Sequence, residues 1–480
     1  MKKLSVTIFI LLSCCYVFSQ INTFTYSFSN TDNVRPMDIY EDSLGDIFVL
    51  TSSCEKESGF SNCQALLIKL DPYGNFIDSL WIRQHNRKLH LQDILLASIN
   101  TIIICGMSAN ENDTKPSVEF YRVSMDLSLI DNHNHSFPDD YKWFSVKTNK
   151  GLNNSYLVTG GVFQPVNKLR VYVLRLSANL DSIQMTIEQD YADQGCYLME
   201  YEPNRYWLLT GIIPRYLIMD GDFNVIQESK VPRRTSSPYG IKWDSDSSFY
   251  LTGEWNGGSD DDIGIIRQLH VTDTTDLIFN DWGTLDTMDL TAGLGALDFN
   301  NNDSIYIGGT TNFSPNYLSP FPSWYFLIQT DSMLNIRWEK FIGGEAHYTV
   351  DKIKAARDGG CFLASAKYDY MSGADHTDLE LIKVNHLGQF VHLPENPSIE
   401  IREAIVYPNP GTDQLNIRLA AQHAKANFQL YDNRGGLIMN QTLTKKVTQI
   451  NTNFLKSGTY VFRIYNENGL YEEGKWVKIQ

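Results

Sequence analysis

The sequence has an excess of negative charge and only one long apolar run. It contains 40 lysine and arginine residues against 56 aspartate and glutamate residues, which gives a net charge of −16. An acidic chain is not attracted to phosphate backbones or anionic bilayers, so a nucleic-acid partner is disfavoured. After residue 18, no apolar stretch approaches the roughly 20 residues that a membrane-spanning helix needs. We therefore expect no nucleic-acid partner and no transmembrane segment in the mature chain.

Cysteine is scarce, and no C-x-x-C pair occurs among the seven cysteines. Redox exchange at a dithiol and a zinc knuckle are therefore disfavoured. Cys54 and Cys63 flank a polar segment between two strand-like runs, and they are the natural disulfide pair in an oxidising compartment. Three further cysteines lie among strand residues, where a free thiol usually acts as a small buried hydrophobe: Cys105, Cys196 and Cys361.

No motif in the main body requires catalysis. Three clusters hold ligating or titratable side chains: His133-Asn134-His135, Asp260-Asp261-Asp262 and Asp375-His376-Thr377-Asp378. The histidine pair lacks a third ligand at a recognisable spacing, and the aspartate run lacks the alternating ligands of a calcium loop. The third cluster is not accompanied by a nucleophile motif such as G-x-S-x-G. We interpret all three as solvated loops and predict no metal and no cofactor.

The one long apolar run is N-terminal. Lys2 and Lys3 precede about 15 apolar residues, too few to span a bilayer, and the small residues Val17 and Ser19 lie three and one places before a possible cut ahead of Gln20. This pattern predicts a cleaved secretory signal over residues 1–19. Lipid attachment at Cys14 is an open alternative, although Leu12 fits a lipobox poorly. Export to the cell surface or the medium, by way of the periplasm, follows from either interpretation.

A short strand pattern that ends in small residues recurs through most of the chain. Seven copies follow one another at intervals of 42 to 56 residues, and examples are Ile47–Thr51, Tyr156–Gly160 and Ile305–Gly309. A second strand pattern, such as Leu67–Asp71, follows each copy, and leading and trailing strands surround the pair. Gly, Asn or Asp lies at the joints, where hairpins need positive φ. The repeat period is near that of propeller blades.

We predict an all-β fold, with a seven-bladed β-propeller over residues 20–393. Four-stranded sheets cannot bury both faces alone, but radial stacking covers each sheet with the next. The segment from Ile336 to Gly360, with its Trp and Gly-Gly pairs, resembles blade repeats of secreted Bacteroidetes propellers. The alternating segment Thr23–Phe28 is expected to close the ring by pairing in the last blade, whose own final strand, Gln389–Leu393, is short.

The last part of the chain carries an ordered set of short motifs. Two prolines in residues 394–398 break the strand rhythm and indicate a linker, 394–403, before a small antiparallel β-sandwich over 404–480. The motif residues are Tyr407, Pro408, Asn409, Pro410, Tyr431, Asp432, Gly436, Gly458 and Tyr460. This set is similar to the type A C-terminal sorting domain of the type IX secretion system. The resemblance implies two partners, the outer-membrane translocon and a sortase-like peptidase. An accessory β-sandwich is the alternative.

The sequence indicates an exported protein without defining its ligand. We expect a binding or adhesion scaffold for a glycan or a protein. A secreted hydrolase or lyase with its site in the propeller channel stays open, because propellers assemble sites from distant loops. Most tryptophans lie within strand patterns, but Trp255 and Trp324 lie in loop-like stretches and are the candidates for exposed contacts.

Overall fold

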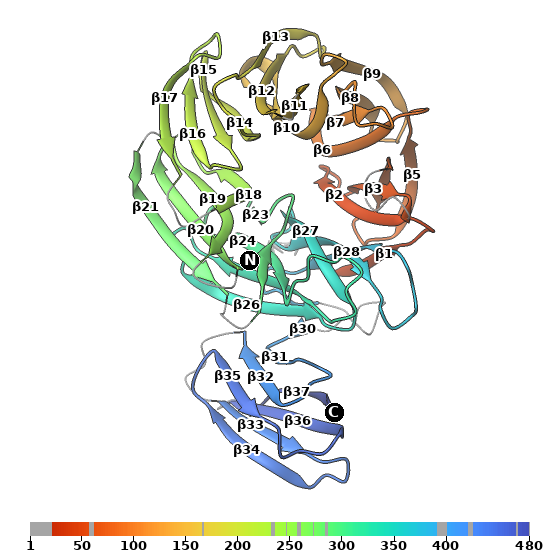
Figure 1. Cartoon of the computed structure of the whole chain (residues 1–480), viewed down its shortest axis with the longest axis vertical. Helices are drawn as coiled ribbons and strands as arrows, with labels where there is room; N and C mark the ends of the chain where they lie inside the picture. The colour runs from red at the N-terminus through yellow and green to blue at the C-terminus, as the bar shows by residue number, and fades with distance from the viewer. Residues whose placement is uncertain are drawn as a thin grey trace, which may run out of the picture.

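The computed structural model describes the chain from residue 22 to residue 479 with several gaps (Figure 1). The described ranges are 22–56, 62–165, 168–231, 236–245, 247–256, 261–271, 273–283, 287–390, 401–420, 426–466 and 469–479. The predicted signal segment with Cys14, Asp260 of the aspartate run, and most of the linker lie outside these residues. The fold is all-β, and a 3₁₀ turn, η2 (Leu152–Asn154), precedes β11.

Seven antiparallel sheets in the described residues surround one centre, and in five of them four consecutive strands pair in chain order. The first four sheets are β2 (Asn33–Glu41), β3 (Ile47–Cys54), β4 (Cys63–Leu70), β5 (Phe76–Ile82); β6 (Lys88–Ser98), β7 (Thr101–Ala109), β8 (Ser117–Ser124), β9 (Leu129–Ser136); β10 (Lys142–Lys150), β11 (Tyr156–Gln164), β12 (Lys168–Leu176), β13 (Ser182–Ile187); and β14 (Gly195–Glu202), β15 (Arg205–Thr210), β16 (Arg215–Met219), β17 (Val225–Lys230).

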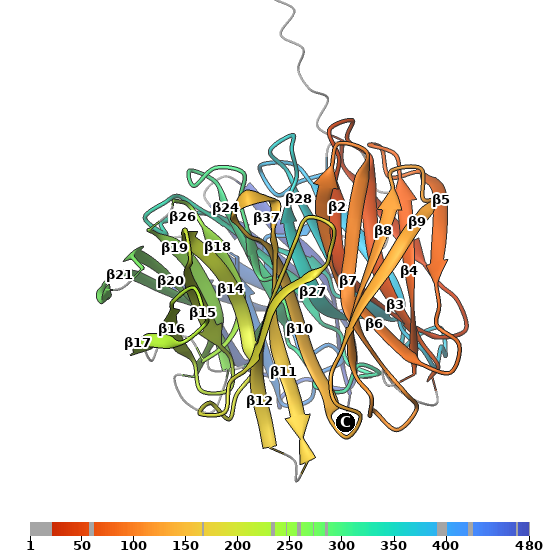
Figure 2. The ribbon, with the colours of Figure 1, turned by 90° about the horizontal axis from the view of Figure 1, so that it is seen from above.

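The remaining sheets of the ring are β18 (Ser236–Trp243), β19 (Phe249–Asn256), β20 (Asp261–His270), β21 (Asp273–Trp282); β22 (Asp289–Thr291), β23 (Leu297–Asp298), β24 (Ile305–Thr311), β25 (Trp324–Thr330), β26 (Ile336–Gly343), β30 (Ile401–Arg402); and β27 (His347–Ala355), β28 (Cys361–Tyr368), β29 (Asp378–Val384), β1 (Phe24–Phe28). Viewed after a 90° turn, neighbouring sheets stand side by side (Figure 2). The fold is therefore a β-propeller.

Burial follows the order of the strands within each sheet. The second strands are enclosed by neighbouring sheets, and every residue of β3 and β24 is buried. The outer strands are exposed, as the first three residues of β5 show. Neighbouring sheets cover the second strand on both faces. This explains why it is the most apolar strand of each repeat.

The ring closes as predicted. β1 pairs antiparallel with β29, from Phe24 opposite Lys383 to Phe28 opposite Leu379. The expected final strand at Gln389–Leu393 is wrong in its described part, because Gln389 and Phe390 form no strand. β1 takes the fourth position of that sheet instead.

The turns between third and fourth strands correct one expectation. A polar side chain begins five of the described turns; the Asp71 carboxylate, for example, accepts backbone N–H groups of Tyr73 and Asn75, both at 2.8 Å. We expected Gly, Asn or Asp at the positive-φ position. In four of these turns that position holds a large apolar residue that is buried: Leu127, Leu180, Phe223 and Leu334. Burial of such a side chain offsets the roughly 1–2 kcal/mol cost of left-handed backbone.

The C-terminal domain has two sheets around its own core. One comprises β31 (Ala404–Tyr407), β32 (Gln414–Leu419) and β35 (Val447–Asn451), and the other β33 (Ala426–Tyr431), β34 (Leu437–Leu443), β36 (Gly458–Asn466) and β37 (Gly469–Lys478). Phe428, Phe462 and Trp476 fill the space between them. Within the described part of the predicted linker, β30 pairs with β26 and so belongs to the propeller sheet.

The structure joins Cys54 to Cys63, which face each other where β3 ends and β4 begins. The other described cysteines are free thiols, and Cys105 and Cys361 are buried. No helix of the described chain is long and apolar enough to cross a bilayer.

Candidate functional site

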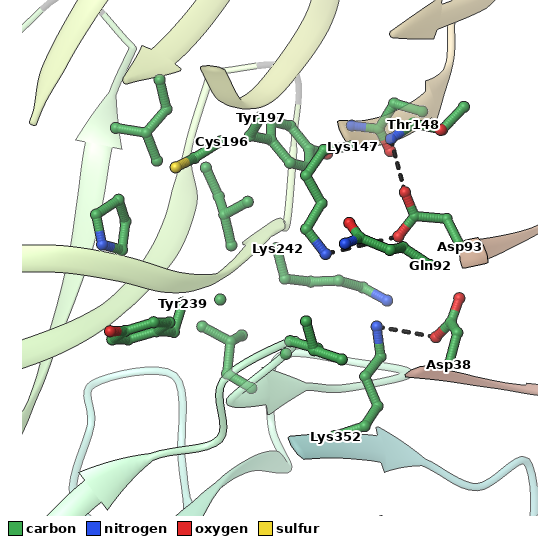
Figure 3. Close-up of a pocket in the computed structure, with 18 of the residues that line it drawn as sticks. Asp38, Gln92, Asp93, Lys147, Thr148, Cys196, Tyr197, Tyr239, Lys242 and Lys352 are labelled. Atoms are coloured by element: carbon green, nitrogen blue, oxygen red, sulfur yellow. Dashed lines mark hydrogen bonds and ion pairs between the residues drawn. The ribbon is translucent and has the colours of Figure 1, made fainter. Parts of the chain in front are cut away.

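A cavity of about 610 Å³ lies at the centre of the ring, and all seven sheets contribute to its lining. Figure 3 shows lysine, aspartate and tyrosine side chains that project into it from different strands. Its charged lining comprises four lysines and three aspartates: Lys147, Lys242, Lys352, Lys354, Asp38, Asp93 and Asp298. None of these residues was predicted from the sequence.

Irregular innermost strands bring these side chains to the cavity. In six sheets the register of the innermost strand shifts by one residue, as between Pro36 and Asp38 and between Leu91 and Asp93. In the remaining sheet the innermost strand divides into β22 and β23, and Gly293 and Gly295 line the cavity between them. A bulge bends the strand and redirects the following side chain, here toward the axis.

Each of the three aspartates links its own sheet to the next. Asp38 accepts the backbone N–H of Ile94 at 2.9 Å, and Asp93 accepts that of Thr148 at 2.8 Å. Asp298 likewise accepts the N–H of Ala355 at 3.1 Å. These carboxylates therefore satisfy buried backbone donors between sheets, and their first role is structural.

Lysines neutralise the three carboxylates. Lys352 lies 2.9 Å from Asp38, and Asp298 has two cations, Lys242 at 2.6 Å and Lys354 at 3.2 Å. Burial opposes ionisation of Asp298, but Lys354 and Lys242 outweigh it and lower its pKa.

The pair of Lys147 and Asp93 is looser, with 3.7 Å between Nζ and Oδ1. Burial dominates at Asp93 and raises its pKa, although Lys147 acts in the opposite direction. The Lys147 side chain keeps 31% of its surface exposed, so its ammonium group retains access to the cavity.

The cavity has little that could act as a nucleophile or general base. No histidine belongs to its described lining, and the carboxylates are engaged by lysines and backbone N–H groups. Burial, followed by the charge of Asp193, raises the pKa of the Cys196 thiol to about 12. A thiol with such a pKa stays protonated at neutral pH and is a poor nucleophile.

The predicted aromatic contacts lie elsewhere. Trp324 is not in an exposed loop; it lies in β25 with 5% of its surface exposed, in a core shared with Tyr407. Trp255 lies in β19 and is half-buried, with its ring against Phe279. Glycine, serine and proline near each tryptophan made these segments resemble loops in the sequence. In the structure, paired strands on both sides hold each segment as a strand.

Two of the three polar clusters also lie in strands. His133 and His135 are in β9, where His135 faces the carbonyl oxygen of Leu180 at 2.9 Å. Asp262 is a buried residue of β20 rather than part of a loop tip. The solvated-loop interpretation was wrong for both, because the histidines lie on the outermost strand of their sheet and Asp262 lies near the start of an inner strand that pairs on both sides.

The third cluster lies at the surface, where β29 begins. His376 Nδ1 is 3.2 Å from Asp375, and Nε2 is 3.5 Å from Asp378. Asp375 also pairs with Lys56 at 2.7 Å. None of these residues lines the central cavity. Among the described residues, no three His, Cys, Asp or Glu side chains converge as a metal site.

The motif residues of the C-terminal domain hold turns and the last strand. The carbonyl oxygen of Pro408 accepts the Trp476 indole N–H at 2.8 Å, and the Asn409 side chain bonds both Lys475 and Val477 in β37. Gly411, after Pro410, bonds the carbonyl oxygen of Val477.

The later motif residues act in the same way. Asp432, after Tyr431, accepts the N–H groups of Arg434 and Gly436. Tyr460, two residues after Gly458, donates from its hydroxyl to the Lys456 carbonyl at 2.7 Å. These residues thus set the local fold of the domain, and no ligand is needed to explain them.

Residues 405–478 match the family model of the secretion system C-terminal sorting domain. The tail is therefore a type IX sorting domain, which implies handling by the type IX machinery and export to the cell surface or the medium. No protein of curated function matches the chain.

Solved propeller structures resemble the chain at low similarity. A virginiamycin B lyase of Staphylococcus aureus, a catalytically inactive variant crystallised with quinupristin, has 10% identity and a TM-score of 0.43, with 76% of this chain and all of that chain covered. The propeller domain of the trilobed protease of Pyrococcus furiosus has 10% identity and a TM-score of 0.42, with 77% of this chain and 98% of that chain covered. A coronin WD40 domain of Toxoplasma gondii has the same identity and TM-score, with 77% and 89% covered.

Proposed function

We propose that the chain is an exported binding protein whose propeller cavity holds an anionic ligand, namely an acidic oligosaccharide. The observation that carries the proposal is the charge of the cavity. Four lysines face three aspartates there, in a chain whose net charge is −16. The lining carries four lysines minus three aspartates, a net charge of +1, whereas the whole chain carries −16, so the cavity is the place where this protein repels an anion least.

The neutral lining groups favour a sugar over a simple anion. Gln92, Asn149 and Tyr239 line the cavity beside the lysines. Amide and phenol groups supply the donors and acceptors that sugar hydroxyls require, and lysine ammonium groups pair with carboxylates as point charges. A uronic acid carries both kinds of group.

The sorting tail supports the location, and the N-terminal segment 1–19 acts as the export signal that brings the chain to the periplasm. The mature protein then works at the cell surface or in the medium, as an adhesion or capture scaffold. A hydrolase or lyase in the same cavity has less support, since the described part of the lining has no histidine and its carboxylates already have partners.

Calorimetric titration with tri-galacturonic acid and with the neutral galactose trimer tests the proposal. We expect the acidic trimer to bind, the neutral trimer to bind at least tenfold more weakly, and added salt to reduce the affinity. Lys147→Gln should weaken binding about tenfold, because it removes one exposed charge contact with the ligand. Lys168→Gln, at an exposed position outside the cavity, serves as the matched control.

Thermal unfolding of both variants shows whether the substitutions leave the fold intact. Equal affinity for the acidic and neutral trimers, or a Lys168→Gln effect as large as that of Lys147→Gln, would contradict the proposed site. Asp93 keeps its hydrogen bond from the Thr148 N–H in Lys147→Gln, so the variant is expected to fold.

A further inference from the structure

The sorting domain packs directly on the propeller sheet built from β22 to β26. Strand β30 extends that sheet, with Ile401 opposite Ile342 and Arg402 opposite Phe341. Figure 1 shows the domain beside this sheet, with β30 between the two. The outer edge of this sheet, β26, is thus paired with β30, which lies in the segment that leads to the sorting domain.

A buried ion pair crosses the interface. Arg418 of β32 donates to both carboxylate oxygens of Asp289 in β22, at 2.9 and 2.8 Å, and neither side chain is exposed. The guanidinium also lies over the rings of Phe326 and Phe341, 5.2 Å from each centroid. Removing one partner of such a pair leaves a charge buried without compensation.

Apolar contacts and two further ion pairs adjoin this pair. Ile405, Tyr407 and Ala420 of the sorting domain share one core with propeller residues such as Trp324. Lys446 of the sorting domain pairs with Glu339 at 3.0 Å, and Lys340 pairs with Glu403. A desolvated contact of apolar and paired charged side chains, with Glu339 and Lys340 also buried, is typical of a stable protein interface rather than of two units joined by a linker.

We propose that this face of the propeller is a binding site for the sorting domain. Its non-covalent contacts are sufficient to hold the domain after the connecting chain is cut. Cutting the connecting chain would then leave the domain in place, and its release would require a separate undocking step. The inference depends on the interface alone and is independent of any ligand in the central cavity.

A chain with an inserted protease site at residues 394–398 tests this. The full-length protein is purified, cut, and analysed by size exclusion and native mass spectrometry at micromolar concentration. The two fragments should remain together as one 1:1 particle that retains β30 with the tail. Separation of the wild-type fragments would overturn the proposal, as would 2:2 particles, which would mean that the site takes the tail of a second copy.

Variants on both sides of the interface distinguish docking from misfolding. Arg418→Ala in the tail and Asp289→Asn in the propeller should each weaken fragment association at least about 100-fold. Arg463→Ala is the matched control, because Arg463 lies on the other sheet of the same domain, is 47% exposed and pairs with Glu473. If both interface variants associate as tightly as the control, the ion pair does not hold the tail.

Discussion

Gly74 and Gly359 share a left-handed backbone and differ in what surrounds them. Their φ angles are +86° and +89°, but a Cβ at Gly74 would overlap the ring of Phe24, whereas nothing lies within 4 Å of one at Gly359. Alanine costs about 1 kcal/mol at either position because of the backbone. At Gly74 we expect an additional cost of about 1–3 kcal/mol from overpacking.

Urea unfolding of Gly74→Ala and Gly359→Ala measures this difference. Equal losses of unfolding free energy would show that Phe24 moves aside and that β1 is loosely held.

His347 is a second residue with a defined expectation. Its Nδ1 lies 3.0 Å from the carbonyl oxygen of Phe321, and burial lowers the pKa of the imidazole below 6.5. The unfolded chain therefore binds more protons than the folded protein as the pH falls from about 6.5 toward the lower folded pKa. The free energy of unfolding should decrease over that range.

His347→Gln removes this proton uptake, so its stability should depend less on pH below 6.5 than that of the wild type. His270→Gln, at an exposed position, is the control. Chemical denaturation from pH 7.5 to pH 5 is the measurement, and parallel curves for wild type and His347→Gln would refute the expectation.

At the scale of elements, ring closure rests on the short strand β1. Phe24 is buried in the core between the first and last sheets, and Ser27 donates to Glu380 at 2.5 Å. Phe24→Ala should cost about 3–5 kcal/mol, the usual range for a buried phenylalanine. The equivalent change at Phe76, which is 55% exposed on β5, should cost about 0.5 kcal/mol or less.

Hydrogen exchange locates the effect of Phe24→Ala. Amides of β29, the partner of β1, should exchange faster in this variant, while β7 should keep its protection. Unchanged exchange in β29 would mean that the ring is closed by other contacts.

At the scale of the whole molecule, the two domains are coupled through Asp289 and Arg418. Arg418→Met removes the guanidinium from a buried ion pair, so we expect a loss of about 3–5 kcal/mol. The double variant Asp289→Asn with Arg418→Met should recover part of that loss, because the buried carboxylate charge is then absent.

Calorimetry of the wild type, the two single variants and the double variant gives the coupling energy. Additive losses would show that the two side chains do not interact across the interface.

Much of the architecture could be predicted because it depends on short sequence patterns. The apolar runs ending in small residues are the second strands, since only strands covered on both faces are so uniformly apolar. Thr23–Phe28 alternates like an edge strand and pairs as one. Part of the tail motif likewise uses side-chain to backbone bonds that span two to four residues, such as those of Asp432, whereas Asn409 bonds to β37, 66 and 68 residues away.

Short sequence patterns were least informative for side chains whose exposure depends on the position of their strand in the sheet. Trp324 stands next to serine and proline yet lies beneath the sorting domain. Asp38 and Asp93 carry a weak signal, since each precedes an isoleucine in the leading strand of its repeat, and a search for aspartate at that position would have found them.

The sequence by itself determined the strand repeat, the closing strand and the identity of the tail, because these depend on residues that are neighbours in the chain. Only the tertiary structure decided which side chains meet at the axis and how the tail is held. Asp289 and Arg418 are 129 residues apart. Their pairing follows from the curvature of the ring and the packing of two domains, which no local pattern encodes.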